Sequence, residues 1–167
     1  GFLLVFGHNL LDPVEALHKE PFGFWWDLLH RGNFVFYPYA DGRVLGIFYP
    51  FAPWAGVMAL GYCLGKIFAA DVSESHRKMT LIKTGTGLLI LFVLLRLSNI
   101  YGDPHPWVSQ KNILYTILSF INLNKYPPSL LYLCLTIGPA LILLAFTEHL
   151  KSKQSHVVMV FGRVAFF

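Results

Sequence analysis

The side chains best suited to chemistry gather in a few polar stretches of an otherwise apolar chain. Carboxylates and imidazoles can move protons, amides can position polar groups, and cationic side chains can hold anions. The candidates for a substrate site are His8, Asn9, Asp41, Arg96, Asn99, Asp103, His105, Lys125 and Tyr126. Because they are far apart in sequence, they can form one site only if the intervening elements bring them to the same end of the fold.

Arg96 lies about one helical turn inside the end of an apolar stretch. A charge in such a place normally faces a partner or a water-filled cavity. Asp103 and Asp41 are the natural partners for this guanidinium. Two interpretations stay open, namely an ion pair that fixes the neighbouring loops and a contact to a substrate.

Two histidines also admit two interpretations each. His105 lies between two prolines, so it is either a turn residue or an exposed proton acceptor. His8 is followed by Asn9, and this polar pair either ends a helix or lines a cavity.

The stretch Asp12-Pro13-Val14-Glu15 has the pattern of a helix start, with Asp as the N-cap and Pro at the first helical position. We therefore expect a helix to begin at Asp12 rather than to run through it. In that case His8 and Asp12 do not share a continuous helical face.

The chain lacks the motifs of common enzyme sites. It has no phosphate-binding loop, no H-E-x-x-H and no G-x-S-x-G pattern, and its seven histidines show no tight metal-ligand spacing. No metal cofactor is therefore expected. Cys63 and Cys134 lie in apolar stretches, where inert thiols are expected.

The composition is too apolar for an ordinary soluble domain. Hydrophobic residues make up 55% of the chain, charged residues 13%, and the mean hydropathy is +0.54. A helix needs about 20 largely apolar residues to cross a hydrocarbon core of roughly 30 Å. Residues 44–65, 79–100 and 126–147 each meet this requirement. We expect an all-α, polytopic transmembrane helical bundle with these three complete spans.

Further helices are expected around the three spans. The apolar ends GFLLVF and VVMVFGRVAFF predict partial spans, so that residues 1–167 form a fragment of one transmembrane domain. Ile113, Ile117 and Phe120 mark one face of a short helix at 111–121, at the membrane interface or packed in the bundle. Gly61 and Gly65 have the small-residue spacing that permits close approach of two helices.

Basic residues near the span ends predict the orientation. Segments 71–80 and 148–156 are expected in the cytoplasm, and segments 7–43 and 101–125 on the opposite side. The cations expected near the cytoplasmic face are Lys66, Arg77, Lys78 and Lys83. They could meet phosphates of a cofactor, or they could simply follow the positive-inside rule. The net charge of +4 does not indicate nucleic-acid binding, because no basic stripe interleaved with aromatic residues is present.

The polar cluster NLNKYPPSLL, residues 122–131, stands directly before an apolar run. Pro127 and Pro128 are expected in the first turn of a helix, where free amide groups and the helix dipole could hold an anion beside Lys125. The alternative is that Lys125 and Tyr126 anchor the span at the lipid headgroups.

Five boxes occur in order across nearly the whole chain: HNLLD, YPFAPWAGVMALGYCLGKIF, LRLSNIYGDPHPW, NKYPPSLLYLCLTIGPALILLA and FGRVAFF. In these boxes the chain resembles bacterial membrane proteins related to the catalytic domain of heparan-α-glucosaminide N-acetyltransferase. The resemblance implies a transferase in the bacterial inner membrane that moves acetyl from cytosolic acetyl-CoA to an amino sugar or envelope glycan on the outer face. The catalytic histidine of that family lies upstream of residue 1, so the catalytic residue is unknown here.

Three hypotheses follow. The first is a transmembrane acyltransferase in the lipid bilayer, with a glycan or amino-sugar acceptor and acetyl-CoA as co-substrate. The second is a carrier or flippase without covalent chemistry. The third is a membrane scaffold, and a homo-oligomer is compatible with all three.

Overall fold

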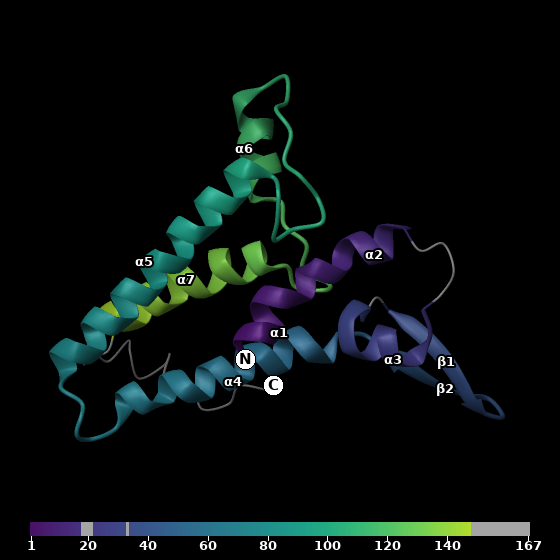
Figure 1. The fold of residues 1–167 in the computed structure, drawn as a ribbon, viewed down its shortest axis with the longest axis horizontal. Helices are drawn as coiled ribbons and strands as arrows, with labels where there is room; N and C mark the ends of the chain where they lie inside the picture. Colours follow the sequence, from purple (N-terminus) through teal and green to yellow (C-terminus); the bar gives the residue numbers. More distant parts are fainter. Residues whose placement is uncertain (18–21, 33, 148–167) are drawn as a thin grey trace, which may run out of the picture.

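Three long apolar helices dominate the fold. The computed structural model describes residues 1–17, 22–32 and 34–147. Its long helices are α4 (Phe51–Leu64), extended by the 3-10 turn η3 (Gly65–Phe68), α5 (Glu74–Ser98) and α7 (Leu130–Thr147). By length and composition, these three can cross a membrane. The chain passes back and forth along them, so that α4 and α7 begin, and α5 ends, at one end of the molecule (Figure 1). We call this the polar end, and the opposite end, which holds η3 and the start of α5, the basic end.

Long apolar helices are found at the three predicted spans, with shifted boundaries. The second helix begins earlier than expected, because Ser73 caps it by accepting from the amide of His76. The third begins at Leu130, so the expectation that Pro127 and Pro128 form its first turn is wrong. Ser129 ends the preceding turn, and its hydroxyl oxygen accepts from the amide of Tyr132 at 3.1 Å. The predicted partial span near the C-terminus and segment 148–156 lie outside the described residues.

A β-hairpin precedes the first long helix and is the exception to an otherwise helical fold. Strands β1 (Val35–Ala40) and β2 (Arg43–Ile47) pair antiparallel around a turn at Asp41-Gly42, where Gly42 has φ +70°. The predicted start of the first span at residue 44 is therefore wrong, since residues 44–47 belong to β2. An uncharged stretch also suits a strand, and Asp-Gly between apolar runs is a hairpin turn signal.

The N-terminal helices run on without a break, contrary to the expected start at Asp12. Helix α1 (Phe2–Gly7) passes through the 3-10 turn η1 (His8–Leu11) into α2 (Asp12–Leu17), and Asp12 itself has helical φ −55° and ψ −43°. Pro13 is the second residue of α2 and closely follows the 3-10 turn, so the amide that proline lacks falls where the regular α-helical bonding begins. His8 and Asp12 therefore lie on one continuous helical segment.

Close packing of α5 on α7 rests on two glycines (Figure 1). A Cβ atom on Gly85 would lie 2.6 Å from the carbonyl oxygen of Gly138, so the two backbones nearly touch. The predicted pair Gly61 and Gly65 does not do this, since a Cβ atom on either would meet nothing within 4 Å among the described residues. Small residues thus mediate helix packing, but at other positions than the sequence spacing indicated.

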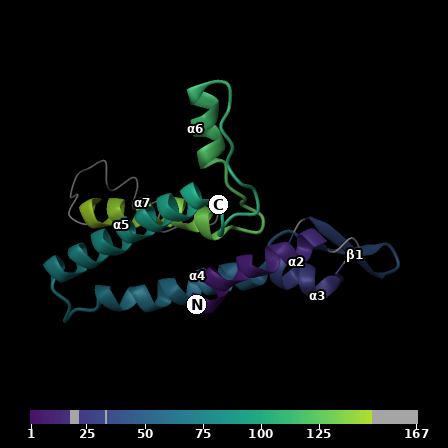
Figure 2. The same cartoon turned by 45° about the horizontal axis from the view of Figure 1, so that its top comes forward.

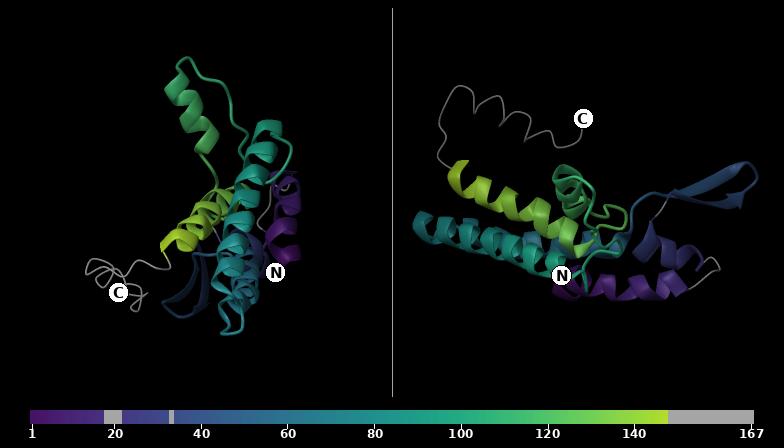
Figure 3. Two further views of the ribbon diagram at one scale, coloured as in Figure 1. Left: turned by 90° about the vertical axis from the view of Figure 1, so that its left-hand side faces the viewer. Right: turned by 90° about the horizontal axis from the view of Figure 1, so that it is seen from above.

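A short helix, α6 (Ile113–Ile121), is found where a non-spanning helix was expected. Asn112 caps it by accepting from the amide of Leu114 at 2.9 Å. Helix α6 rises steeply away from α5 and α7 instead of packing along them (Figure 2). The β-hairpin projects from the same end of the molecule, beyond α2 and α3 (Phe24–Trp26) (Figure 3).

Candidate functional site

Arg96 fixes the loops at the polar end. Its guanidinium donates to four backbone carbonyl oxygens, those of Ser119, Phe120 and Asn122 at the end of α6 and that of His105, at 2.8 to 2.9 Å. Nη1 also lies 3.9 Å from Oδ1 of Asp103. These contacts are those of the first interpretation, an ion pair that holds the loops, because the donors of the buried side chain are directed at protein groups.

Asp103 ties the same loop to the start of α7. Its side chain is fully buried, and Oδ2 accepts from the hydroxyl of Ser129 at 2.6 Å and from the amide of Asn124 at 2.8 Å. Oδ1 accepts from the amide of His105 at 2.9 Å. Both oxygens of the carboxylate thus accept hydrogen bonds, which offsets the cost of burying the charge.

His8 and Asn9 join the N-terminal helices to the start of α7. The side-chain oxygen of Asn9 accepts from the amide of Leu130 at 2.9 Å. Nε2 of His8 lies 2.8 Å from the carbonyl oxygen of Pro128, and Nδ1 lies 3.0 Å from that of Val5. Both side chains are buried. Of the two interpretations offered for this pair, the structure gives the one in which it fastens helix ends.

The expected anion site at the start of α7 is contradicted by these bonds. The amide of Leu130 donates to Asn9, that of Leu131 to the carbonyl oxygen of Gly102, and that of Tyr132 to Ser129. No leading amide among these three is left for an anion.

A second group of polar side chains, which the sequence did not predict, lies beside the contact of His8 and Asn9 with the start of α7. Nε2 of His30 faces Oδ1 of Asp12 at 3.8 Å and Oε1 of Glu15 at 3.9 Å. We call Asp12, Glu15 and His30 the acid–histidine cluster. Trp26 donates from Nε1 to Oε1 of Glu15 at 2.6 Å, and the second carboxylate oxygen of Asp12 accepts from the side chain of Asn9 at 2.8 Å.

His30 is the distinctive member of this cluster. Its side chain is only 4% exposed, yet neither ring nitrogen has a hydrogen-bond partner among the described residues. The carboxylates stand too far away for a direct hydrogen bond but within the range of an ion pair if His30 is protonated. Buried polar groups are almost always paired, so an unpaired imidazole is a candidate for function.

Burial sets the charge states in the cluster. Loss of water lowers the pKa of His30, partly offset by the charge of Glu15 and reinforced by that of His8. Burial also raises the pKa of Asp12, against the opposing effects of its bond to Asn9 and of His8. The carboxylates are near enough to attract an imidazolium. Burial nevertheless has the larger effect on the pKa of His30, because no direct hydrogen bond joins the carboxylates to its ring. A neutral imidazole beside two carboxylates can accept a proton from a bound cation.

Asp27 and Tyr37 flank the cluster. The phenol of Tyr37, on β1, donates to one oxygen of Asp27, in the π-helical turn η2 (Asp27–Arg31), and this bond raises the pKa of Tyr37. The other oxygen of Asp27 is buried without a partner among the described residues. This bond ties the hairpin to the turn that carries His30.

The remaining predicted residues at the polar end do not join the cluster. Asp41 is exposed in the hairpin turn, and the side chain of His105 is 72% exposed. Asn99 holds a loop through its two bonds to the backbone of Trp107. The ammonium of Lys125 lies 5.1 Å from the ring centre of Tyr126, and it lowers the pKa of that phenol. The ring centre of Tyr126 also lies 5.4 Å from that of Tyr49.

The candidate cofactor cations all lie at the basic end. Arg77 stacks over Phe68 and Lys78 over Phe146, with 5.5 Å and 5.0 Å from cation to ring centre. Lys66 and Lys83 are exposed.

The sequence contained a signal for the missed residues. Trp26 and His30 are four residues apart in FWWDLLH, and Asp12 and Glu15 are three apart, so each pair shares a helical face. The expected helix start at Asp12 hid the connection, because it turned this carboxylate into a cap.

Fold and site together define a mostly helical protein with three helices able to cross a membrane and, at one end, an acid–histidine cluster around a buried imidazole. No family model, curated protein or solved structure matches this chain. In the part of the chain that the structure describes, no three His, Cys, Asp or Glu side chains are arranged to hold a metal ion.

Proposed function

We propose that this is an integral protein of the bacterial inner membrane, with the basic end in the cytoplasm and the polar end in the periplasm. The alternating direction of the three apolar helices supports this placement, as does the concentration of Lys66, Arg77, Lys78 and Lys83 at one end.

Within that membrane, the proposed activity is acyl transfer from cytosolic acetyl-CoA to the amino group of an amino sugar or envelope glycan. The observation that carries the proposal is the buried, unpaired imidazole of His30, which faces two carboxylates at the polar end. The family resemblance supplies the acyl donor, and the cluster supplies carboxylates and an imidazole suited to the acceptor's amino group.

The cluster suits the proton chemistry of an amine acceptor. An amine arrives as an ammonium ion, which Asp12 and Glu15 would hold, and it must lose a proton before it can attack. His30 takes the proton that the ammonium loses. The amine nitrogen then bonds to the acetyl carbonyl carbon, the bond from that carbon to its donor breaks, and the departing donor takes up the second nitrogen proton. Because its pKa is lowered, His30 is neutral at pH 7 and ready to accept that proton.

The test is acetyl transfer by the complete protein in liposomes, with labelled acetyl-CoA on one face and glucosamine on the other. Replacing the base, as in His30→Gln, should lower kcat by about a hundredfold or more. The matched control is His76→Gln, an exposed histidine at the basic end. Equal rates for His30→Gln and the unmodified protein would contradict the role of His30.

The same cluster also suits a carrier or flippase, because a buried titratable group near a membrane boundary can couple transport to protons. The liposome experiment separates the two functions. A carrier would move the labelled amino sugar across the bilayer without CoA, and no acetylated product would form.

A further inference from the structure

Helix α6 covers its polar side and exposes its apolar side, which is the reverse of a helix on the surface of a soluble protein. Its polar side is covered, since the hydroxyls of Thr116 and Ser119 accept from the amides of Gln110 and Val108 in the loop that precedes it. Its apolar side is open, and the side chains that it exposes by 46 to 75% are Ile113, Leu114, Ile117, Leu118 and Ile121. An apolar strip of this kind needs a non-aqueous cover.

The position of α6 indicates what that cover is. Arg96 binds the last carbonyls of α6 from a position two residues before the end of α5, a 25-residue helix. A helix of that length spans roughly 37 Å, somewhat more than a hydrocarbon core of about 30 Å, so its end lies at the headgroups. Because α6 leaves this point at a steep angle to α7 (Figure 2), a membrane crossed by α5 and α7 would have α6 along its surface.

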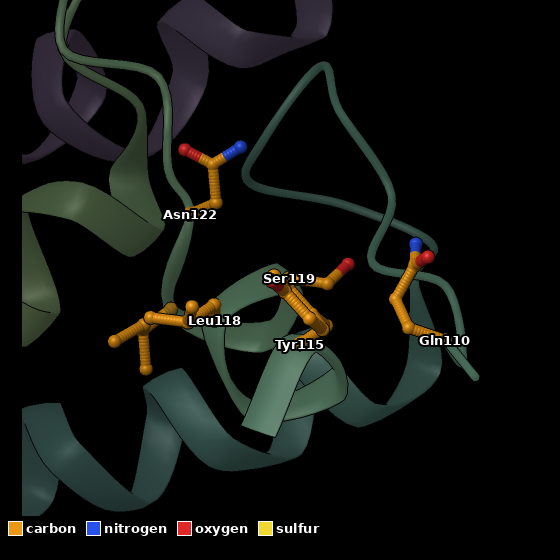
Figure 4. Close-up of a pocket in the computed structure, with 6 residues that line it drawn as sticks. Gln110, Tyr115, Leu118, Ser119 and Asn122 are labelled. Carbon is orange, nitrogen blue, oxygen red and sulfur yellow. The ribbon is translucent and has the colours of Figure 1, made fainter. Parts of the chain in front are cut away.

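A groove accompanies the exposed strip. It has a volume of about 540 Å³ and is lined by Gln110, Tyr115, Leu118, Ser119, Ile121 and Asn122 (Figure 4). None of these side chains is charged. The side-chain amides of Gln110 and Asn122 make no hydrogen bond to the described residues, while Leu118 and Ile121 continue the apolar strip. The groove thus offers neutral hydrogen-bonding groups next to a surface for hydrocarbon.

We propose that this groove binds the uncharged, hydroxyl-bearing headgroup of a membrane lipid, whose chains lie against the apolar side of α6. The inference rests on the proposed membrane insertion and is independent of the acid–histidine cluster. Amide groups can each donate to and accept from sugar or polyol hydroxyls. None of the lining side chains is a cation, so the groove itself offers a phosphate headgroup no ionic partner.

The experiment is lipid competition on the complete protein in detergent, with a glucosyl diacylglycerol and phosphatidylglycerol at equal concentration and the retained lipid measured by native mass spectrometry. The unmodified protein should retain the glucosyl lipid about fivefold over phosphatidylglycerol. Combined Gln110→Leu and Asn122→Leu should abolish the preference, because these changes keep side-chain volume and remove the amides. The matched control Lys111→Gln changes a neighbouring exposed residue outside the groove and should leave the preference intact.

Equal retention of both lipids by the unmodified protein, or an unchanged preference in the double variant, would overturn the proposal. Resistance to alkaline extraction from membranes tells this failure apart from failure of the proposed membrane insertion. If the protein resists extraction but shows no lipid preference, only the groove is ruled out. If it is extracted, the membrane placement itself is wrong.

Discussion

At the scale of single residues, the polar end contains two kinds of buried charge. Arg96 and Asp103 have their donors and acceptors directed at protein groups, which is what a structural ion pair requires. His30 is buried to the same degree but has no hydrogen-bond partner in the described chain. This difference, and not charge or burial alone, separates the structural residues from the candidate for chemistry.

The lowered pKa of His30 predicts how stability depends on pH. Above the ordinary value of 6.5 the imidazole is neutral in both the folded and the unfolded chain, so it has no effect. Below 6.5 the unfolded chain takes up a proton that folded His30 refuses, and the free energy of unfolding falls by about 1 kcal/mol per pH unit until the folded pKa is reached.

Chemical unfolding of the unmodified protein and of His30→Gln between pH 7.5 and 5.5 checks this prediction. The difference between the two proteins isolates His30, because every other ionisable side chain is present in both. A difference that stays constant across this range would show that His30 is protonated as easily as in the unfolded chain.

At the scale of elements, the contact of α5 with α7 depends on a missing side chain. Gly85→Ala should lower the free energy of unfolding by about 1–3 kcal/mol, since the new methyl group would overlap the carbonyl oxygen of Gly138 at 2.6 Å. Gly87→Ala is the matched control on the same helix, where a Cβ atom meets nothing within 4 Å of the described chain. It should be neutral or stabilising by up to about 1 kcal/mol. Denaturant titration of both variants measures this, and equal effects would refute the close contact.

Helix α6 depends on Arg96 in a similar way. Arg96→Leu removes the four bonds to backbone carbonyls and leaves Asp103 buried without its cation, at an expected cost of about 3–5 kcal/mol. Cleavage by trypsin after Lys111 should become much faster, because the loop before α6 is no longer held. Arg43→Leu, in the exposed part of the hairpin, is the comparison and should leave the cleavage rate unchanged.

At the scale of the whole molecule, the two ends differ in chemistry as a membrane protein's two faces do. The basic end carries exposed lysines, while the polar end carries the acid–histidine cluster, the hairpin and α6 (Figure 1).

In a protein without Cys63 and Cys134, single cysteines at exposed Ser109 and Ser75 report on the two ends. An impermeant maleimide should label Ser109→Cys in cells with a permeabilised outer membrane, and Ser75→Cys only after the inner membrane is opened. Labelling of both from one side would contradict the proposed crossing.

The sequence by itself determined the three long helices, α6 and the polar character of one end, because apolar length and helical periodicity are local properties. It also supplied Arg96 and Asp103 as partners. The structure alone decided that Asn9 caps α7, that Gly85 rather than Gly61 packs against another helix, and that His30 meets Asp12 and Glu15. These contacts join segments that are distant in sequence, so they depend on tertiary packing. The structure also decided the hairpin and the continuous helix through Pro13, because strand pairing and turn geometry are not fixed by short sequence patterns.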